Sequence, residues 1–136
     1  MSSHHTLEEG NELSLDFNKL SKVVHGSGDV IPVVVQHALT KEVLLVAYVN
    51  RAALNTSLST GIATFWSTSR HELWVKGKTS GDFLDLREVR VNCEQNSLLF
   101  LVVPRSGGVC HTKLADGGAR QTCFYRVIRD GRLVHL

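Results

Sequence analysis

The chain has little of the residues that mark secreted, membrane-spanning or nucleic-acid-binding proteins. It contains only three cysteines in 136 residues, and an odd number of thiols without a secretory signal argues against a disulfide framework. Its longest apolar runs, Val30–Val35 and Val43–Val49, are too short to span a bilayer. The net charge of +2 is too small to indicate nucleic-acid binding by electrostatics. We therefore expect a cytoplasmic protein with no nucleic-acid or membrane partner.

The remaining composition indicates one folded domain. Hydrophobic residues make up 43% and charged residues 21% of the chain, which is typical of a globular protein long enough to bury a core. Residues 1–12 are polar and predict a flexible leader. Residues 13–136 contain no internal repeat or linker and predict a single domain.

The residue pattern predicts an α+β fold with a mostly antiparallel, barrel-like sheet and one or two short helices. Two β-branched runs, residues 30–36 and 43–49, are joined by a link short enough for a hairpin. Asn50 is a good N-cap for a helix over residues 51–59, which Gly61 would end. Further strands are expected within residues 62–67, 72–76, 83–93, 98–103, 123–128 and 133–135, a short helix within residues 13–20, and a glycine-rich loop over residues 104–121.

All three cysteines, Cys93, Cys110 and Cys123, lie in the last third of the chain beside polar or ionisable residues. Three soft ligands are the number that a catalytic zinc ion needs, because its fourth position stays open for water. A hydrolytic metalloenzyme is therefore the first interpretation. The alternative is three buried free cysteines that act as small hydrophobic residues.

The first cysteine lies in the run Asn92-Cys93-Glu94-Gln95-Asn96. Side chains alternate between the faces of a strand, so an extended run would place Asn92, Glu94 and Asn96 on one side. Their oxygens suit a hard cation such as magnesium, while the Cys93 thiolate on the other side suits zinc. The alternative interpretation is a polar turn between two strands.

Two further groups of residues suit catalysis and phosphate binding. His111 follows Cys110 directly, and an imidazole that titrates near neutrality suits proton transfer; the alternative is a loop histidine without a partner. Residues 67–81 combine basic, hydroxyl and glycine residues, which suit an anionic phosphate. The P-loop spacing is absent, and a charged surface hairpin explains the same composition. Trp66 and Trp74 suit base stacking or core packing.

Taken together, these residues resemble the phosphoribosyl-AMP cyclohydrolase family over about residues 30–128. The resemblance implies a zinc-dependent hydrolase that opens the adenine ring of 1-(5-phosphoribosyl)-AMP at the N1–C6 bond, in histidine biosynthesis. The matching blocks are Ile31-Pro32-Val33-Val34-Val35-Gln36, Ala47-Tyr48-Val49-Asn50, Trp66-Ser67-Thr68-Ser69-Arg70, residues 73–81, residues 92–99, Cys110-His111-Thr112 and Cys123-Phe124-Tyr125-Arg126.

The resemblance also implies a role for each matching residue. Cys93, Cys110 and Cys123 would bind zinc at a homodimer interface, with the first cysteine from one subunit and the other two from its partner. His111 matches the acid/base histidine, and the residues around Cys93 match a magnesium site. The matching substrate-binding residues are Arg70, Trp74, Lys76, Lys78, Thr79, Ser80 and Gly81.

The chain departs from the family pattern at three places. The family's Asp-Cys-Asp-x-Asp run has amides here at Asn92 and Asn96, so three negative charges fall to one and we expect weaker magnesium binding. Twelve residues instead of six separate Cys110 from Cys123, and we expect residues 113–118 to bulge outward, since loop closure costs little extra with length. Lys78 replaces a common glutamate and adds positive charge.

Two other zinc proteins compete with this interpretation. A zinc nucleoside or base deaminase attacks the same kind of carbon, but its H-x-E…P-C-x-x-C signature is absent. A structural zinc module would close its site with a fourth ligand, such as His111, and leave no open position.

Overall fold

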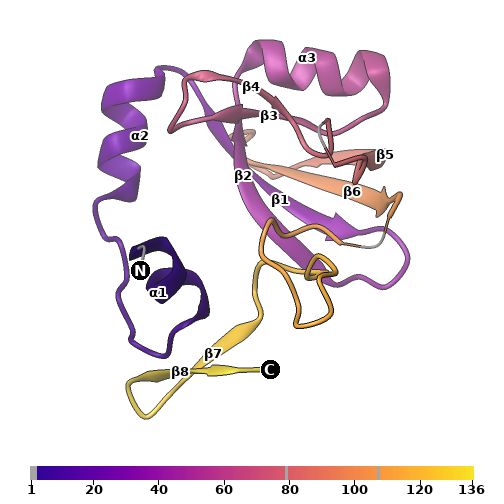
Figure 1. Cartoon of the computed structure of the whole chain (residues 1–136). Helices are drawn as coiled ribbons and strands as arrows, with labels where there is room; N and C mark the ends of the chain where they lie inside the picture. Colours follow the sequence, from indigo (N-terminus) through magenta and orange to yellow (C-terminus); the bar gives the residue numbers. More distant parts are fainter. Residues whose placement is uncertain (1–2, 79, 107) are drawn as a thin grey trace.

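The computed structural model describes residues 3–78, 80–106 and 108–136 of the chain. These residues form three helices and eight strands (Figure 1). The helices are α1 (Ser3–Glu9), α2 (Lys19–Ser27) and α3 (Arg51–Thr60), and the strands are β1 (Ile31–His37), β2 (Val43–Val49), β3 (Thr64–Ser67), β4 (Glu72–Val75), β5 (Leu84–Val91), β6 (Leu98–Pro104), β7 (Arg126–Arg129) and β8 (Arg132–His135).

The largest sheet has four strands in the order β2-β1-β6-β5, and β3–β4 and β7–β8 form separate two-stranded sheets. Strand β1 runs parallel to β6, while the other strand pairs are antiparallel. The predicted α+β class with mostly antiparallel strands is confirmed. The predicted barrel is wrong, because the described strands divide among three sheets and none of these closes on itself.

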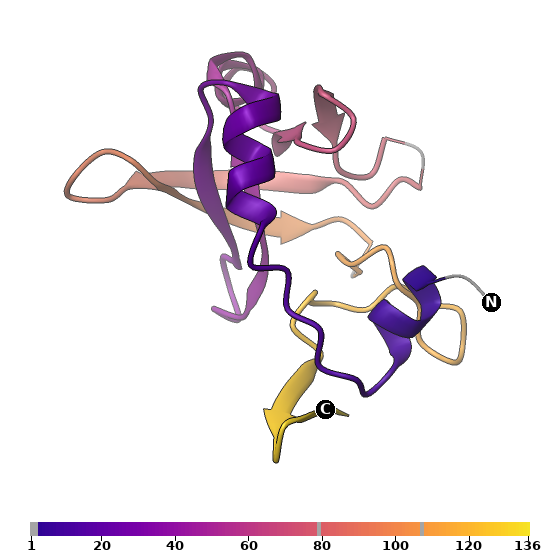
Figure 2. The same cartoon turned by 90° about the vertical axis from the view of Figure 1, so that its left-hand side faces the viewer.

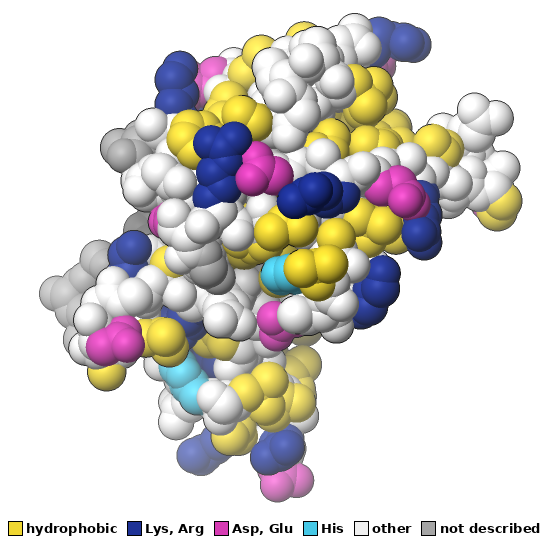
Figure 3. Space-filling model, turned by 90° about the vertical axis from the view of Figure 1, so that its right-hand side faces the viewer, with side chains coloured by type: hydrophobic (Ala, Val, Ile, Leu, Met, Phe, Trp, Pro, Cys, Tyr) yellow, Lys and Arg dark blue, Asp and Glu magenta, His cyan; other side chains and the backbone are white. Residues whose placement is uncertain are grey.

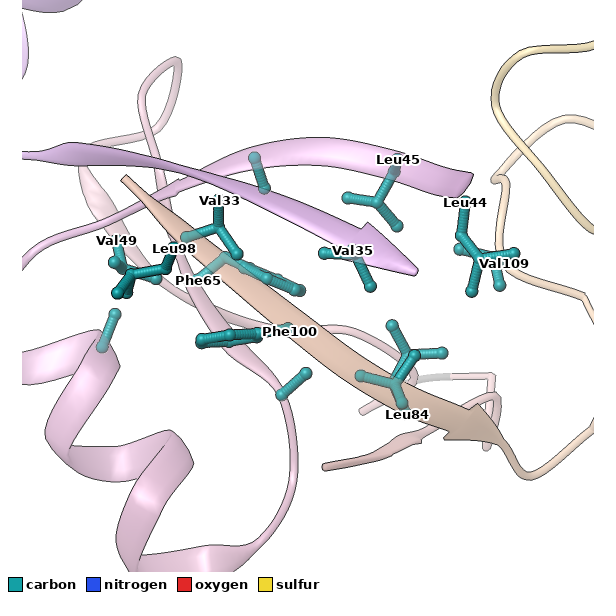
Figure 4. Packing of buried hydrophobic residues seen from close by; sticks show 14 residues of the cluster. Val33, Val35, Leu44, Leu45, Val49, Phe65, Leu84, Leu98, Phe100 and Val109 are labelled. Atoms are coloured by element: carbon teal, nitrogen blue, oxygen red, sulfur yellow. The ribbon is translucent and has the colours of Figure 1, made fainter. Parts of the chain in front are cut away.

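The hydrophobic core lies between the four-stranded sheet, α3 and the β3–β4 hairpin (Figure 4). Phe65 from β3 and Phe100 from β6 are fully buried, and their ring centroids are 5.9 Å apart. Val109 extends the core toward the loop after β6, since it is buried next to Leu44 (Figure 4). Packing in the core therefore holds Val109, the residue directly before Cys110, in a defined position.

Helix α3 has the predicted ends. The Asn50 side chain accepts a hydrogen bond from the Ala53 backbone N–H at 2.8 Å, which satisfies one of the free donors in the first turn. Gly61 ends the helix in the left-handed region, with φ of +72°, where glycine pays no steric penalty. Buried Ser57 joins α3 to β3, because its Oγ accepts from the Thr64 N–H at 2.8 Å.

The region before β1 differs from the prediction. The helix expected within residues 13–20 begins only at Lys19, because Asp16 forms a turn: its carboxylate accepts from the Asn18 N–H at 3.0 Å and pairs with Lys22 at 3.1 Å. Three helices are described instead of one or two, because α1 lies within the predicted leader. The flexibility of residues 1–12 in solution stays a prediction. No helix in the described ranges is both long and apolar enough to cross a membrane.

Two loops extend from the ends of this framework. The turn joining β5 to β6 projects from the body of the protein, on the left of Figure 2. The long loop after β6 lies on the opposite side, near α1 and the β7–β8 hairpin (Figure 2). The turn that contains Cys93 and the loop that contains Cys110 therefore lie far apart within one chain.

Candidate active site

A cavity of about 930 Å³ lies beside β2 and the β3–β4 hairpin. Its walls come from segments far apart in the sequence, because α1, α2 and the loop after β6 each contribute a side chain. It gathers six of the residues predicted to bind substrate or transfer protons: Arg70, Trp74, Lys76, Lys78, Ser80 and His111.

The predicted substrate-binding residues occupy different positions around this cavity. Trp74 packs on Phe65 with ring centroids 5.5 Å apart, so it belongs to the cavity wall and the edge of the core at once. Lys76 is buried, at 8% exposure, whereas Arg70 is exposed in the β3–β4 turn and lies 3.7 Å from Glu72. The cavity therefore has cations both on its wall and at its rim.

The end of this segment is a glycine turn. Gly77 has φ of +92°, and a Cβ there would lie 2.3 Å from the Asp82 carbonyl carbon, so only glycine fits. Gly81 closes the turn by donating its N–H to the Gly77 carbonyl at 2.7 Å. Thr79, which the sequence predicts as a substrate contact, lies outside the described residues.

Cys110 and Cys123 are held together by the backbone around them. The Cys110 N–H donates to the Arg120 carbonyl at 2.9 Å, and the Cys123 N–H donates to the Leu44 carbonyl, at the start of β2, at 2.8 Å. After the twelve residues that follow Cys110, the chain comes back to the four-stranded sheet at Leu44. Cys110 and Cys123, two of the three predicted zinc ligands, therefore lie together within one chain.

The two thiols share one negative charge. A hydrogen bond from Cys123 lowers the pKa of Cys110 to about 5, and the Thr112 hydroxyl, 3.0 Å from the Cys110 Sγ, acts in the same direction. The same hydrogen bond raises the pKa of Cys123, while the positive charge of Lys76 opposes that rise. Cys110 is therefore the thiolate of the pair at neutral pH, and the thiolate is the form that binds metal.

Residues 113–118 form an outward hairpin, as the loop-length argument predicts. Lys113 pairs with Ala119 in an antiparallel bridge, and the Arg120 N–H donates to the Thr112 carbonyl at 3.2 Å. The extra residues leave and rejoin the chain at this base, so they do not separate Cys110 from Cys123.

Cys93 is not part of this pair. It is exposed in the turn between β5 and β6, on the opposite side of the molecule from the loop after β6 (Figure 2). No group of three or more His, Cys, Asp or Glu side chains in the described part of the chain is arranged to hold a metal ion. A three-cysteine site therefore needs a Cys93 from outside the chain that supplies Cys110 and Cys123.

Strand β5 ends at Val91, two residues before the end of the strand predicted within residues 83–93, and the polar turn is the interpretation that the structure confirms for residues 92–96. The Asn92 Oδ1 accepts from the backbone N–H groups of Asn96 and Ser97, both at 2.9 Å, and the Asn92 amide donates to the Asn96 Oδ1 at 2.6 Å. These amide oxygens close the turn. Magnesium binding by Asn92, Glu94 and Asn96 stays a prediction.

Among the charged residues of the cavity that sequence reasoning missed, Glu8 and Lys19 lie before β1. Lys19 reaches across from α2 and donates to the Thr68 hydroxyl at 2.9 Å. Glu8 comes from α1 and its carboxylate contacts the His111 ring. Neither has a local sequence signal, because each lies before β1 and meets the cavity only through the tertiary fold.

Comparison with known proteins identifies one family. Residues 45–125 match the family model described as phosphoribosyl-AMP cyclohydrolase. A phosphoribosyl-AMP cyclohydrolase of Caulobacter vibrioides is 43% identical over 133 residues, which cover 97% of this chain and 86% of the relative. A protein of the same name from Methanothrix thermoacetophila is 42% identical over 115 residues, covering 85% and 88%. The chain therefore belongs to the phosphoribosyl-AMP cyclohydrolase family of enzymes.

Proposed function

We propose that the protein opens the adenine ring of 1-(5-phosphoribosyl)-AMP by hydrolysis of the N1–C6 bond, as a step of histidine biosynthesis in the cytoplasm. One observation carries this proposal: His111, which directly follows Cys110 of the Cys110–Cys123 pair, lines a cavity that also carries the cations of Arg70, Lys76 and Lys78. The family membership supports the same substrate.

The donor set of this loop fits zinc. Cys110 is ionised at neutral pH, and Cys123 keeps its proton in the hydrogen bond to Cys110. Soft thiolate ligands favour zinc over hard cations. When bound, zinc supplies a nucleophile from water at neutral pH by lowering the pKa of that water. Because three thiolates make zinc a weak Lewis acid, the reaction also needs a proton donor and acceptor close by.

A second copy of the chain supplies the third cysteine in this proposal. Cys93 is exposed in a projecting turn, and Val91 just before it is 55% exposed. The face in Figure 3 carries apolar side chains between charged ones, with a projection on the right. A partner that accepts this turn would bury Val91 and bring Cys93 to Cys110 and Cys123, so the enzyme acts as a homodimer.

The cavity fits a nucleotide that carries two phosphates. Its volume of about 930 Å³ lies near the upper end of the usual range of ~300–1,000 Å³ for ligand pockets. Arg70, Lys76 and Lys78 give it positive charge, and Arg and Lys donors are the usual partners of phosphate oxygens. Trp74 adds an apolar wall suited to a purine.

His111 then handles the protons. It is exposed to the cavity, so a bound purine can reach its ring. As the N1–C6 bond breaks, N1 takes up a proton and C6 becomes the carbon of a carboxamide. An imidazole can accept the proton from the attacking water and return it to N1, which is general acid–base catalysis.

The proposal is tested by the hydrolysis of phosphoribosyl-AMP, followed through the absorbance change on ring opening. The zinc-loaded wild type should turn over, and His111→Ala should lower kcat by about 10²–10⁴-fold. His25→Ala is the matched control, because His25 is exposed in α2 and does not line the cavity. A folded, zinc-loaded dimer without turnover would contradict the proposed function.

A further inference from the structure

Helix α1 is clamped to the C-terminal part of the chain at its last turn. The Tyr125 hydroxyl donates to the Glu8 carbonyl at 2.7 Å, the Arg126 guanidinium to the Gly10 carbonyl at 3.0 Å, and the His135 Nε2 to the Glu9 carbonyl at 3.0 Å. The last carbonyls of a helix lack partners within it. Three side chains from the C-terminal region satisfy such groups here and fix where α1 ends.

An ion pair strengthens this clamp. The Arg120 guanidinium donates to both carboxylate oxygens of Glu9, at 2.6 and 2.8 Å, and only 12% of the Arg120 side chain is exposed. The guanidinium also lies over the Tyr125 ring, 4.1 Å from its centroid. A bidentate pair with stacking has a well-defined geometry, so the residue before Glu9 has a defined position too.

The clamp places the Glu8 carboxylate against the candidate acid/base histidine. Glu8 Oε2 lies 2.5 Å from His111 Nε2, although 103 positions separate the two residues. An ionised carboxylate only accepts hydrogen bonds, so Nε2 is the donor in this contact, and in the neutral imidazole Nδ1 is then the nitrogen that can accept a proton. The partner of one ring nitrogen thus selects the tautomer and orients the other nitrogen.

His111 depends on this contact for its orientation. Its side chain is 75% exposed, against 31% for Glu8, and Glu8 is the one hydrogen-bond partner that the described residues give its ring. An exposed imidazole without a partner rotates about two side-chain torsions. We propose that Glu8 is a positioning residue that holds His111 through its Nε2 and presents Nδ1 to the reacting purine.

This inference rests on the proposed acid/base role of His111, and steady-state kinetics test the two separately. Glu8→Ala should lower kcat about 10–100-fold, the range typical of a lost orienting partner, with KM changed less than about threefold. Glu8→Gln keeps an acceptor oxygen and should recover most of kcat. Glu12→Ala is the matched control: it removes an exposed carboxylate of the same segment that does not line the cavity.

A double-mutant cycle shows whether Glu8 acts through His111. If it does, Glu8→Ala in a His111→Ala background should cause no further loss of kcat, because the contact is already absent. An equal loss in both backgrounds would overturn the inference. So would a kcat of Glu8→Ala within about twofold of the wild type, or a Glu8→Gln variant that loses as much as Glu8→Ala.

Nitrogen-15 NMR of the imidazole gives a reading that does not need turnover. The wild type should show His111 with its hydrogen on Nε2, and Glu8→Ala should show a mixture of tautomers. An unchanged His111 signal in Glu8→Ala would overturn the positioning role. If the wild type shows this tautomer but does not hydrolyse phosphoribosyl-AMP, the proposed function fails while the Glu8 contact stands.

Discussion

The loop that holds Cys110 and Cys123 and the turn that holds Cys93 are built in opposite ways. The segment that carries both cysteines begins beside a buried core residue, Val109, and a backbone hydrogen bond from Cys123 to Leu44 attaches it to β2. The turn is exposed, and the Asn92 side chain closes it within a few residues. The conformation of the loop therefore depends on contacts with distant parts of the fold, whereas the turn is held by hydrogen bonds among its own residues.

This difference bears on how the proposed zinc site assembles. The loop already brings two thiols together with one shared charge, so two ligands are organised before any metal binds. The turn contributes one thiol on a hairpin that projects on the side of the chain opposite the loop (Figure 2). Metal binding and dimer formation should therefore be linked in this protein.

The largest effect is expected when a proposed ligand is removed from either region. Cys110→Ser and Cys93→Ser should both lose zinc and lower kcat by about 10³-fold or more, because unbound water keeps a pKa of about 15.7 instead of about 7. The two variants should differ in stability without metal, since Cys110 is buried and Cys93 is exposed. Metal analysis and thermal unfolding after chelation measure both effects. If Cys93→Ser retains its zinc, Cys93 is not a ligand and the turn is not part of the zinc site.

The next effect concerns magnesium at the turn. Asn92→Asp together with Asn96→Asp raises the number of negative charges on the Asn92–Asn96 segment from one to three, so magnesium affinity should rise by about tenfold or more. The lost amide hydrogen bond should cost about 1 kcal/mol of the free energy of unfolding. Titration calorimetry measures the affinity, with Asn55→Asp at an exposed position of α3 as the control. Unchanged affinity would show that the turn is no cation site.

A smaller effect is expected from the clamp that holds α1 to the loop. The hydrogen bond from Arg120 lowers the pKa of Glu9 from its ordinary value of 4.5. The pair therefore stabilises the fold fully above pH 4.5, and this stabilisation is lost as the pH falls through the lower pKa of the folded state. The difference in melting temperature between wild type and Arg120→Met should shrink in this acidic range. A difference independent of pH would contradict the role of the ion pair.

The smallest effect is expected from shortening the loop. Deletion of residues 113–118 joins Thr112 to Ala119 and leaves six residues between Cys110 and Cys123. Because the hairpin leaves and rejoins the chain at one base, zinc content and kcat should stay within about threefold of the wild type, the loop-closure cost being small. Zinc loss on deletion would mean that the hairpin itself holds the two cysteines in place.

Local signals in the sequence predicted those parts of the fold that short-range chemistry decides. The cap at Asn50, the stop at Gly61 and the β1–β2 hairpin all follow from neighbouring residues, and the structure confirms them. The parallel pairing of β1 with β6 joins strands about 65 positions apart, which no local pattern encodes. The strands also divide into three sheets instead of the predicted barrel-like sheet, and this too depends on pairing between distant segments that no local pattern encodes.

The candidate site shows the same limit. Arg70, Trp74, Lys76, Lys78, Ser80 and His111 lie around one cavity, and their contacts with substrate stay a prediction. Glu8 was missed because the polar composition of residues 1–12 predicts a leader, whereas its contact depends on Arg120, Tyr125 and Arg126 at the far end of the chain. The strand predicted within residues 83–93 ends two residues earlier, at Val91, because the Asn92 side chain accepts the backbone hydrogen bonds that close the turn.

The most direct test of the shared site is to mix two inactive variants. Cys93→Ser keeps Cys110 and Cys123, and Cys110→Ser keeps Cys93, so a mixed dimer would contain one complete ligand set and one that lacks two cysteines. After subunit exchange at equal concentrations, half of the dimers are mixed, and about a quarter of the wild-type kcat and zinc should return. No recovery from fully exchanged dimers would contradict a zinc site built from two copies of the chain.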